Sequence, residues 1–248
     1  MRNSIIGRWI IKYTFVGCTA SSLSTGEIFL STLGQVFAQL ACFHIFAPSR
    51  FVRNEFGWPC IIVSGAHFNP IITFAAIITR NIGILSGVLY ILLQFVGGIV
   101  GAAFCLLVAK TGMFKFDWMM TQLAQPAVFQ PPQDLGDAFR QFASEILLSF
   151  LFVLTVFGSF IKSQHLSQET GLEPISSVVA TLPVGFALGA GLLINGCLNP
   201  VRALGPQILS WTWYANSWIY YTAPFIGGAL GGLLYEFIVT KPRRNYIS

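Results

Sequence analysis

The residues with the clearest chemistry are two Asn-Pro pairs, Asn69-Pro70 and Asn199-Pro200, which lie 130 positions apart in an otherwise apolar chain. An Asn side chain can cap the free N–H groups at the start of a helix, and Pro fits the first turn because its missing donor costs nothing there. Each pair follows a glycine-containing segment and precedes apolar residues. The sequence therefore predicts two short helices that begin abruptly within apolar surroundings.

Polar side chains accompany both pairs. Arg202 follows Asn199 by three positions, and a cation is costly in hydrocarbon, so we expect its guanidinium to face a polar path. His67 lies two residues before Asn69, where we expect it to brace the loop. Cys197 lies two residues before Asn199, and two placements remain open for it: it lines the path, or it packs behind the loop.

The composition indicates a membrane protein with several spans. Hydrophobic residues make up 54% of the 248 residues and charged residues 9%, which is too little polar surface to solvate a globule of this size. A span needs roughly 20 apolar residues. Five stretches satisfy this requirement, near residues 25–46, 85–109, 143–161, 174–194 and 217–240. A sixth span is expected at 48–63, where four polar residues interrupt the apolar run: Arg50, Arg53, Asn54 and Glu55.

The basic residues near the two ends predict the orientation. Three lie near the start and three near the finish, namely Arg2, Arg8, Lys12, Lys241, Arg243 and Arg244. Loops rich in Lys and Arg stay on the cytoplasmic side, so both termini are expected there. An even number of spans follows, which favours six over five. Whether the membrane is the plasma membrane or an internal one is left open.

The two halves of the chain repeat each other. The stretch 95–101 matches 225–231 at the same offset of 130 positions, and the stretch around Glu27 matches that around Glu145 at an offset of 118. We therefore predict one channel domain over 1–248, made of repeat 1 (about 25–110), a connector (111–140) and repeat 2 (about 141–240). Three spans per repeat give the copies opposite orientations. The two short helices then enter from opposite faces, and their N-termini meet at the bilayer centre.

The first repeat is shorter than the second in the region of its second span. Residues 44–63 lie where the first repeat is shorter, and they also carry several charges. This region is therefore not expected to form a regular helix facing lipid.

The meeting of two helix N-termini predicts a particular solute chemistry. Two positive dipole ends and two side-chain amides repel cations and offer donors to a neutral molecule with a lone pair. No nucleophile constellation, paired carboxylates or nucleotide loop is present, and five scattered cysteines favour neither a metal site nor a disulfide framework. We therefore expect a channel and not an enzyme, with no cofactor and no nucleic-acid partner. Two alternatives remain: a secondary active transporter, or a structural or regulatory membrane protein that conducts poorly.

These motifs resemble the aquaporins of the major intrinsic protein family. The resemblance rests on Ser64 to Pro70, Gly196 to Pro206, the Glu27 and Glu145 helices, Gln94, Trp218 to Tyr220 and Pro224 to Gly228. It implies an all-helical fold of six spans and two half-helices, a homotetramer with one pore per subunit, and passage of water and other small neutral solutes, such as ammonia or hydrogen peroxide, through the lipid membrane. The wording of the two loops is most similar to an animal subgroup of the family.

The resemblance also implies roles for individual residues. Asn69 and Asn199 would form the central constriction, and Arg202 would lie in an outer filter with Phe186 or Ala187 from the fifth span. Glu27 and Glu145 would hold the pore loops in shape. Ala203 stands where glycerol-conducting members have Asp, so glycerol flux is expected to be low.

The chain departs from the family directly after each Asn-Pro pair. The family usually has Ala there, and this chain has Ile71 and Val201. Branched side chains at these positions are expected to change how the half-helix tips pack and to narrow the pore.

Overall fold

The computed structural model describes residues 67–110, 134–161, 177–194, 196–211, 213 and 215–239. Helices make up all the regular structure within these ranges. Several of the predictions fall outside them, including the first span at 25–46, the role of Glu27 and the irregular second span at 44–63.

Four long helical segments match spans expected from the sequence, and two short helices follow the Asn-Pro pairs. The long segments are α5 (Ile84–Lys110), α7 (Leu135–Val156) with the π-helix η2 (Phe157–Ile161), α9 (Ser177–Leu193), and α11 (Trp218–Leu234) with the π-helix η3 (Tyr235–Val239). The short helices are α4 (Pro70–Ile78) and α10 (Pro200–Ser210). Ile84–Ala103 and Leu135–Ser159 are each long and apolar enough to cross a membrane, and Leu182–Leu193 is a shorter apolar helix.

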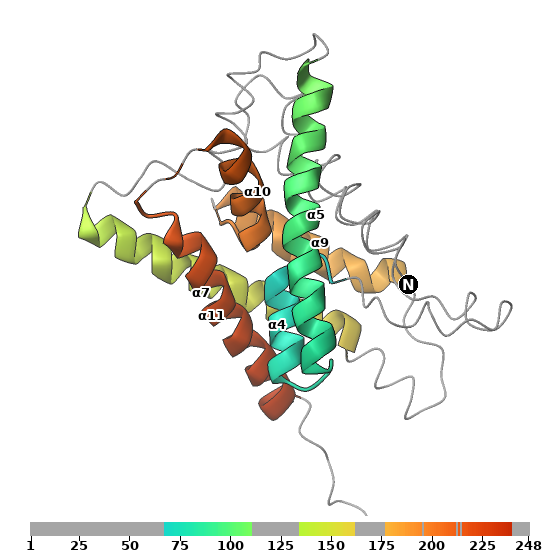
Figure 1. Ribbon diagram of the computed structural model, residues 1–248. Helices are drawn as coiled ribbons and strands as arrows, with labels where there is room; N and C mark the ends of the chain where they lie inside the picture. Colours follow the sequence, from blue (N-terminus) through green and yellow to red (C-terminus); the bar gives the residue numbers. More distant parts are fainter. Residues whose placement is uncertain are drawn as a thin grey trace, which may run out of the picture.

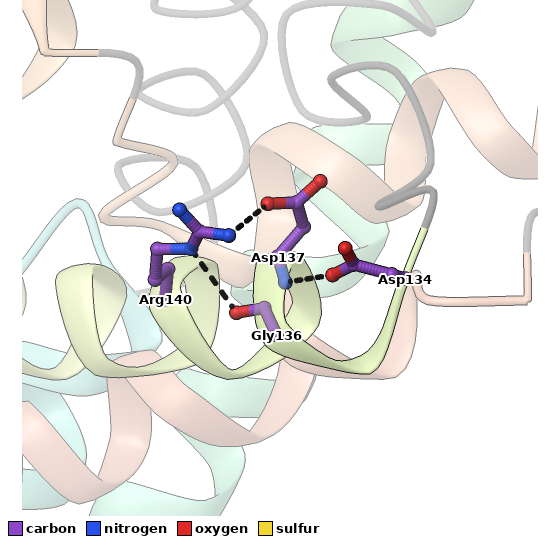
Figure 2. A network of polar contacts seen from close by, with 4 residues as sticks. All are labelled: Asp134, Gly136, Asp137 and Arg140. Atoms are coloured by element: carbon purple, nitrogen blue, oxygen red, sulfur yellow. Dashed lines mark hydrogen bonds and ion pairs between the residues drawn. The ribbon is translucent and has the colours of Figure 1, made fainter.

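Helix α7 begins at Leu135, earlier than the expected span start at residue 143, and so takes up the end of the expected connector. The reason is a local cap (Figure 2). The side chain of Asp134 accepts a hydrogen bond from the backbone N–H of Asp137 at 2.7 Å, and Arg140 pairs with Asp137 at 2.8 Å. Carboxylates at a helix start satisfy free N–H groups and complement the dipole. The polar end of the connector is therefore the exposed first turn of a helix.

Helix α11 packs against two neighbours through two rows of glycines. Gly227 and Gly231 lie against the backbone of α7, where a Cβ at Gly231 would be 2.6 Å from the carbonyl oxygen of Phe150. Gly228 and Gly232 lie against α4, where a Cβ at Gly232 would be 2.9 Å from the Cβ of Ala75. Small residues permit this close approach between helices. Each glycine row is thus a packing surface.

Each half-helix packs on a long helix of the opposite repeat (Figure 1). Helix α4 belongs to repeat 1 and rests on α11 of repeat 2, whereas α10 belongs to repeat 2 and rests on α5 of repeat 1. The tip of each half-helix lies in the protein core. Buried side chains of the largest core cluster surround the tips, including Phe68, Ile71, Phe152, Val153, Phe157, Leu198 and Val201. This packing between the two repeats brings the two Asn-Pro pairs together.

Candidate functional site

The two half-helices begin with identical caps. Asn69 Oδ1 accepts a hydrogen bond from the backbone N–H of Ile71, and Asn199 Oδ1 accepts one from Val201, each at 3.1 Å. Both Asn residues are extended, with φ of −152° and −153°, and each precedes a Pro in the first turn. The side chains thus satisfy free donors that would otherwise be buried without a partner.

The same two side chains also join the loops to each other. Asn69 Nδ2 donates to the carbonyl oxygen of Leu198 at 2.6 Å, and Asn199 Nδ2 donates to that of Phe68 at 3.3 Å. The side chains are 2% and 3% exposed. An amide nitrogen carries two hydrogens, so each Asn keeps one donor beyond this reciprocal pair. The structure therefore brings together two positive helix ends and two amide groups, an arrangement that disfavours cations.

The loop before α10 is held from two sides. Glu145 on α7 accepts hydrogen bonds from the backbone N–H groups of Cys197 and Leu198, the second at 3.2 Å. Arg202 Nη1 donates to the carbonyl oxygens of Cys197 at 2.8 Å and Gly196 at 3.4 Å. The carboxylate therefore binds the donors of this segment, and the guanidinium binds its acceptors.

Hydrogen bonds with Glu145 and Asn69 support an unusual backbone conformation at Leu198. Leu198 has φ of 58°, the left-handed region that a branched residue rarely adopts. Such strain persists only where the surroundings fix it. Glu145 fixes the N–H of Leu198, and Asn69 fixes its carbonyl oxygen. The strained residue presents that carbonyl to the opposite half-helix.

The loop before α4 is braced by a different group, which the sequence analysis did not assign. Gln94 on α5 is fully buried, and its Nε2 donates to the carbonyl oxygen of His67 at 2.6 Å and to Thr73 Oγ1 at 2.9 Å. The ring of His67 lies 6.1 Å from that of Tyr90 between centroids. A buried amide within an apolar span was the available signal for Gln94. Glu27 lies outside the described residues.

A second polar group attaches α10 to α11. Gln207 is fully buried, its Nε2 donates to Ser217 Oγ at 2.8 Å, and its Oε1 accepts from the hydroxyl of Tyr221. The contact among these three residues was not predicted from the sequence, because nothing in their spacing indicates that they meet. Together they fix the far end of the half-helix that carries Arg202.

Three further candidates from the sequence are Cys197, Phe186 and Ala187. Cys197 is fully buried, its Sγ donates to the carbonyl oxygen of Asn199 at 3.2 Å, and it packs against Ala203 and Tyr220. This is the placement behind the loop, the second of the two that the sequence left open. Phe186 is 73% exposed, whereas Ala187 packs against the core cluster. A role in an outer filter remains a prediction for both.

The burial of Cys197 predicts how mercurials act. We expect Cys197→Ser to leave the mercurial sensitivity of water flux unchanged, because a metal ion would have to displace packed neighbours to reach this sulfur. A dose–response curve with mercuric chloride on proteoliposomes of the parent and the variant measures this. Inhibition of the parent together with resistance of the variant would contradict the buried placement.

Comparisons with known proteins show which family the sequence and the fold resemble. The sequence profile described as Major intrinsic protein matches residues 13–235. Two aquaporins of Arabidopsis thaliana are similar: the probable aquaporin TIP3-2 is 33% identical over 72% of this chain and 61% of its own length, and aquaporin TIP1-1 is 36% identical over 70% and 62%. The X-ray structure of the aquaglyceroporin from Plasmodium falciparum gives a TM-score of 0.66 at 16% identity, covering 95% of this chain and 94% of the other.

These findings correct one interpretation and establish another. The curated relatives at 30–36% identity are plant TIP aquaporins, so the similarity to an animal subgroup read from the loop wording was wrong. The chain spans less than two thirds of the length of those relatives. The fold agrees with the expected arrangement of spans and half-helices. The chain is a multi-pass integral membrane protein that belongs to the major intrinsic protein family, a family of channels and not of enzymes.

Proposed function

We propose that the chain is a passive channel for water and other small neutral solutes. The observation that carries this proposal is the reciprocal pair of hydrogen bonds from Asn69 and Asn199 to the opposite loops, at 2.6 Å and 3.3 Å. It fixes both amides where two helix N-termini meet, with one donor of each amide left for a solute. A neutral molecule that accepts a hydrogen bond is favoured there, and a cation is repelled.

Arg202 adds selectivity to this path. Its Nη1 is engaged by the loop carbonyls of Gly196 and Cys197, and the side chain is partly exposed. The guanidinium carries five N–H donors, so several remain for a solute beyond those bonds. The charge is a second barrier to cations. Water, ammonia and hydrogen peroxide are small neutral solutes that suit such a site, whereas glycerol is expected to pass poorly because Ala203 stands where glycerol-conducting members have Asp.

The wider assembly is also a proposal. Exposed apolar side chains follow one face of α5 and α7, and they include Leu85, Leu89, Leu92, Val96, Leu147 and Leu151. Such faces suit lipid or neighbouring subunits. We propose a homotetramer with one pore per subunit and with both termini on the cytoplasmic side, as the basic residues at the ends suggest.

Stopped-flow shrinkage of proteoliposomes tests the function. The purified chain should raise osmotic water permeability well above that of empty liposomes, with a lower activation energy than the lipid pathway. The flux should not depend on a sodium or proton gradient, which separates a channel from a coupled transporter. Permeability equal to that of empty liposomes, from protein shown to be folded, would favour the poorly conducting alternative.

A further inference from the structure

The side chains after the two Asn-Pro pairs face glycines of the opposite repeat. Val201 is fully buried over Gly98 of α5, and a Cβ added at Gly98 would overlap Val201 Cγ1. Ile71 is fully buried over Gly228 of α11, where a Cβ would be 3.1 Å from Ile71 Cβ and 3.3 Å from its carbonyl oxygen. Both side chains therefore fill gaps left by glycines. The effect on how the half-helix tips pack is thus seen in these contacts, and a narrowing of the pore stays a prediction.

A second layer lies one turn further along each contact. Ala75 of α4 faces Gly232 of α11, with 2.9 Å between Ala75 Cβ and a Cβ added at the glycine. In the other contact the types are exchanged, since Gly205 of α10 faces α5, and a Cβ there would be 3.4 Å from Ala102 Cβ. A Cβ at Gly205 would also be 2.8 Å from the carbonyl oxygen of Gly98. In each of these four pairs of facing residues, one residue is a glycine and the other carries the side chain.

We propose that Ile71 and Val201 are positioning residues, which set the distance between each half-helix and the long helix beneath it. Each follows its capping Asn by two positions, so this distance also sets where Asn69 and Asn199 meet the opposite loops. Their hydrogen bonds of 2.6 Å and 3.3 Å tolerate changes of only a few tenths of an ångström. The matched pairs thereby fix the geometry of the constriction. The effect on flux rests on the proposed channel function, whereas the effect on stability does not.

The structure predicts that the two contacts respond differently to the same exchange. Gly98→Ala introduces an overlap with Val201 Cγ1, which Val201→Ala removes; the next contacts, Val201 Cβ at 3.5 Å and its carbonyl oxygen at 3.6 Å, are ordinary. Gly228→Ala instead meets Ile71 Cβ and its carbonyl oxygen, both of which Ile71→Ala retains. The pair G98A/V201A should therefore be rescued. The pair G228A/I71A is the matched control that should not be.

The experiment measures thermal stability in detergent and water permeability per folded channel in proteoliposomes. It uses the four single variants G98A, V201A, G228A and I71A and the two double variants. Overpacking of a well-packed contact forces side chains and backbone to shift. We expect G98A and G228A to lose thermal stability and permeability per folded channel, with the larger loss in G98A, because its added Cβ overlaps Val201 Cγ1. G98A/V201A should recover to within about twofold of the parent, and G228A/I71A should not recover.

Each outcome decides a separate point. If G98A does not fold, recovery of folding in G98A/V201A supports the matched contact, and failure of that double variant overturns it. Equal behaviour of the two double variants also overturns the proposal. If G98A folds with reduced stability but keeps the parent's permeability per channel, the positioning role is wrong while the channel function stands. A parent that does not conduct overturns the proposed function, and the stability measurements alone then decide the contact.

Discussion

Glu145→Gln is expected to remove most of the water flux while the protein still inserts and folds. The two carboxylate oxygens each accept a backbone N–H, from Cys197 and from Leu198. Glutamine has nearly the same volume but only one acceptor, so its NH₂ group would oppose one of these donors. A buried donor without a partner costs about 1 to 3 kcal/mol. The strained conformation of Leu198 then loses one of its supports, and its carbonyl no longer faces Asn69.

Water permeability per folded channel in proteoliposomes measures this effect, and a drop of about tenfold or more is the expected result. Thr155→Val is a suitable control on the same helix, because that hydroxyl bonds only to the carbonyl oxygen of Leu151 one turn away. The control should conduct like the parent. Parent-like flux from Glu145→Gln would mean that the segment keeps its shape without the carboxylate.

Asn69→Asp is expected to have the second large effect, and a larger one than Asn199→Asp. Aspartate keeps the acceptor that caps the half-helix but places a carboxylate oxygen where Nδ2 donated. At position 69 that oxygen would face the carbonyl of Leu198 across 2.6 Å, and at position 199 it would face the carbonyl of Phe68 across 3.3 Å. The shorter contact gives the stronger repulsion. A negative charge between the two positive helix ends also removes the barrier to cations.

Two measurements follow these variants: stopped-flow water permeability, and cation or proton leak into liposomes that contain a pH-sensitive dye. Asn69→Asp should lower water flux about tenfold and raise leak, with Asn199→Asp between it and the parent. Asn199→Asp equal to Asn69→Asp would show that the distances do not set the difference. Unchanged flux and leak in both variants would count against the proposed constriction.

The starts of the half-helices could be predicted because their causes are local. Asn followed by Pro supplies the cap and the first turn within two residues, and both α4 and α10 begin at the Pro. The long helices followed from the length of their apolar stretches. The start of α7 was placed late, although Asp134 three residues before Asp137 was a readable cap. The polar character of the connector concealed it.

The partners across the site could not be predicted, because they depend on how helices far apart in sequence approach one another. Nothing near Gln94 indicates that it bonds to His67 and Thr73, and nothing near Gln207 points to Tyr221. The burial of Cys197 behind its loop was one of two placements, and the structure was needed to choose between them.

The neighbours of Ile71 and Val201 could not be predicted for a related reason. Sequence shows that a branched residue replaces a small one, but the side that it faces depends on the rotation of each half-helix. The glycines at 98 and 228 set that rotation by offering a gap of matching size. The glycines of 95–101 and 225–231 were visible in the sequence as part of the internal repeat, yet the residues that pack against them were not.

The reciprocal bonds from Asn69 to Leu198 and from Asn199 to Phe68 also constrain how the protein is made. A ribosome releases repeat 1 first, when the Leu198 carbonyl that binds Asn69 and the Gly228 that receives Ile71 do not yet exist. During that interval α4 has its own cap but lacks the Leu198 carbonyl that accepts its hydrogen bond and the glycine against which Ile71 packs. The packing of the α4 tip is thus completed only after α11, which carries Gly228, has been synthesised. Because α4 contains no cysteine, the test uses a chain in which the native cysteines are replaced and one cysteine is introduced at Ala76. Ribosome-bound chains that end before α11 should react there with water-soluble thiol reagents, and chains that include α11 should be protected.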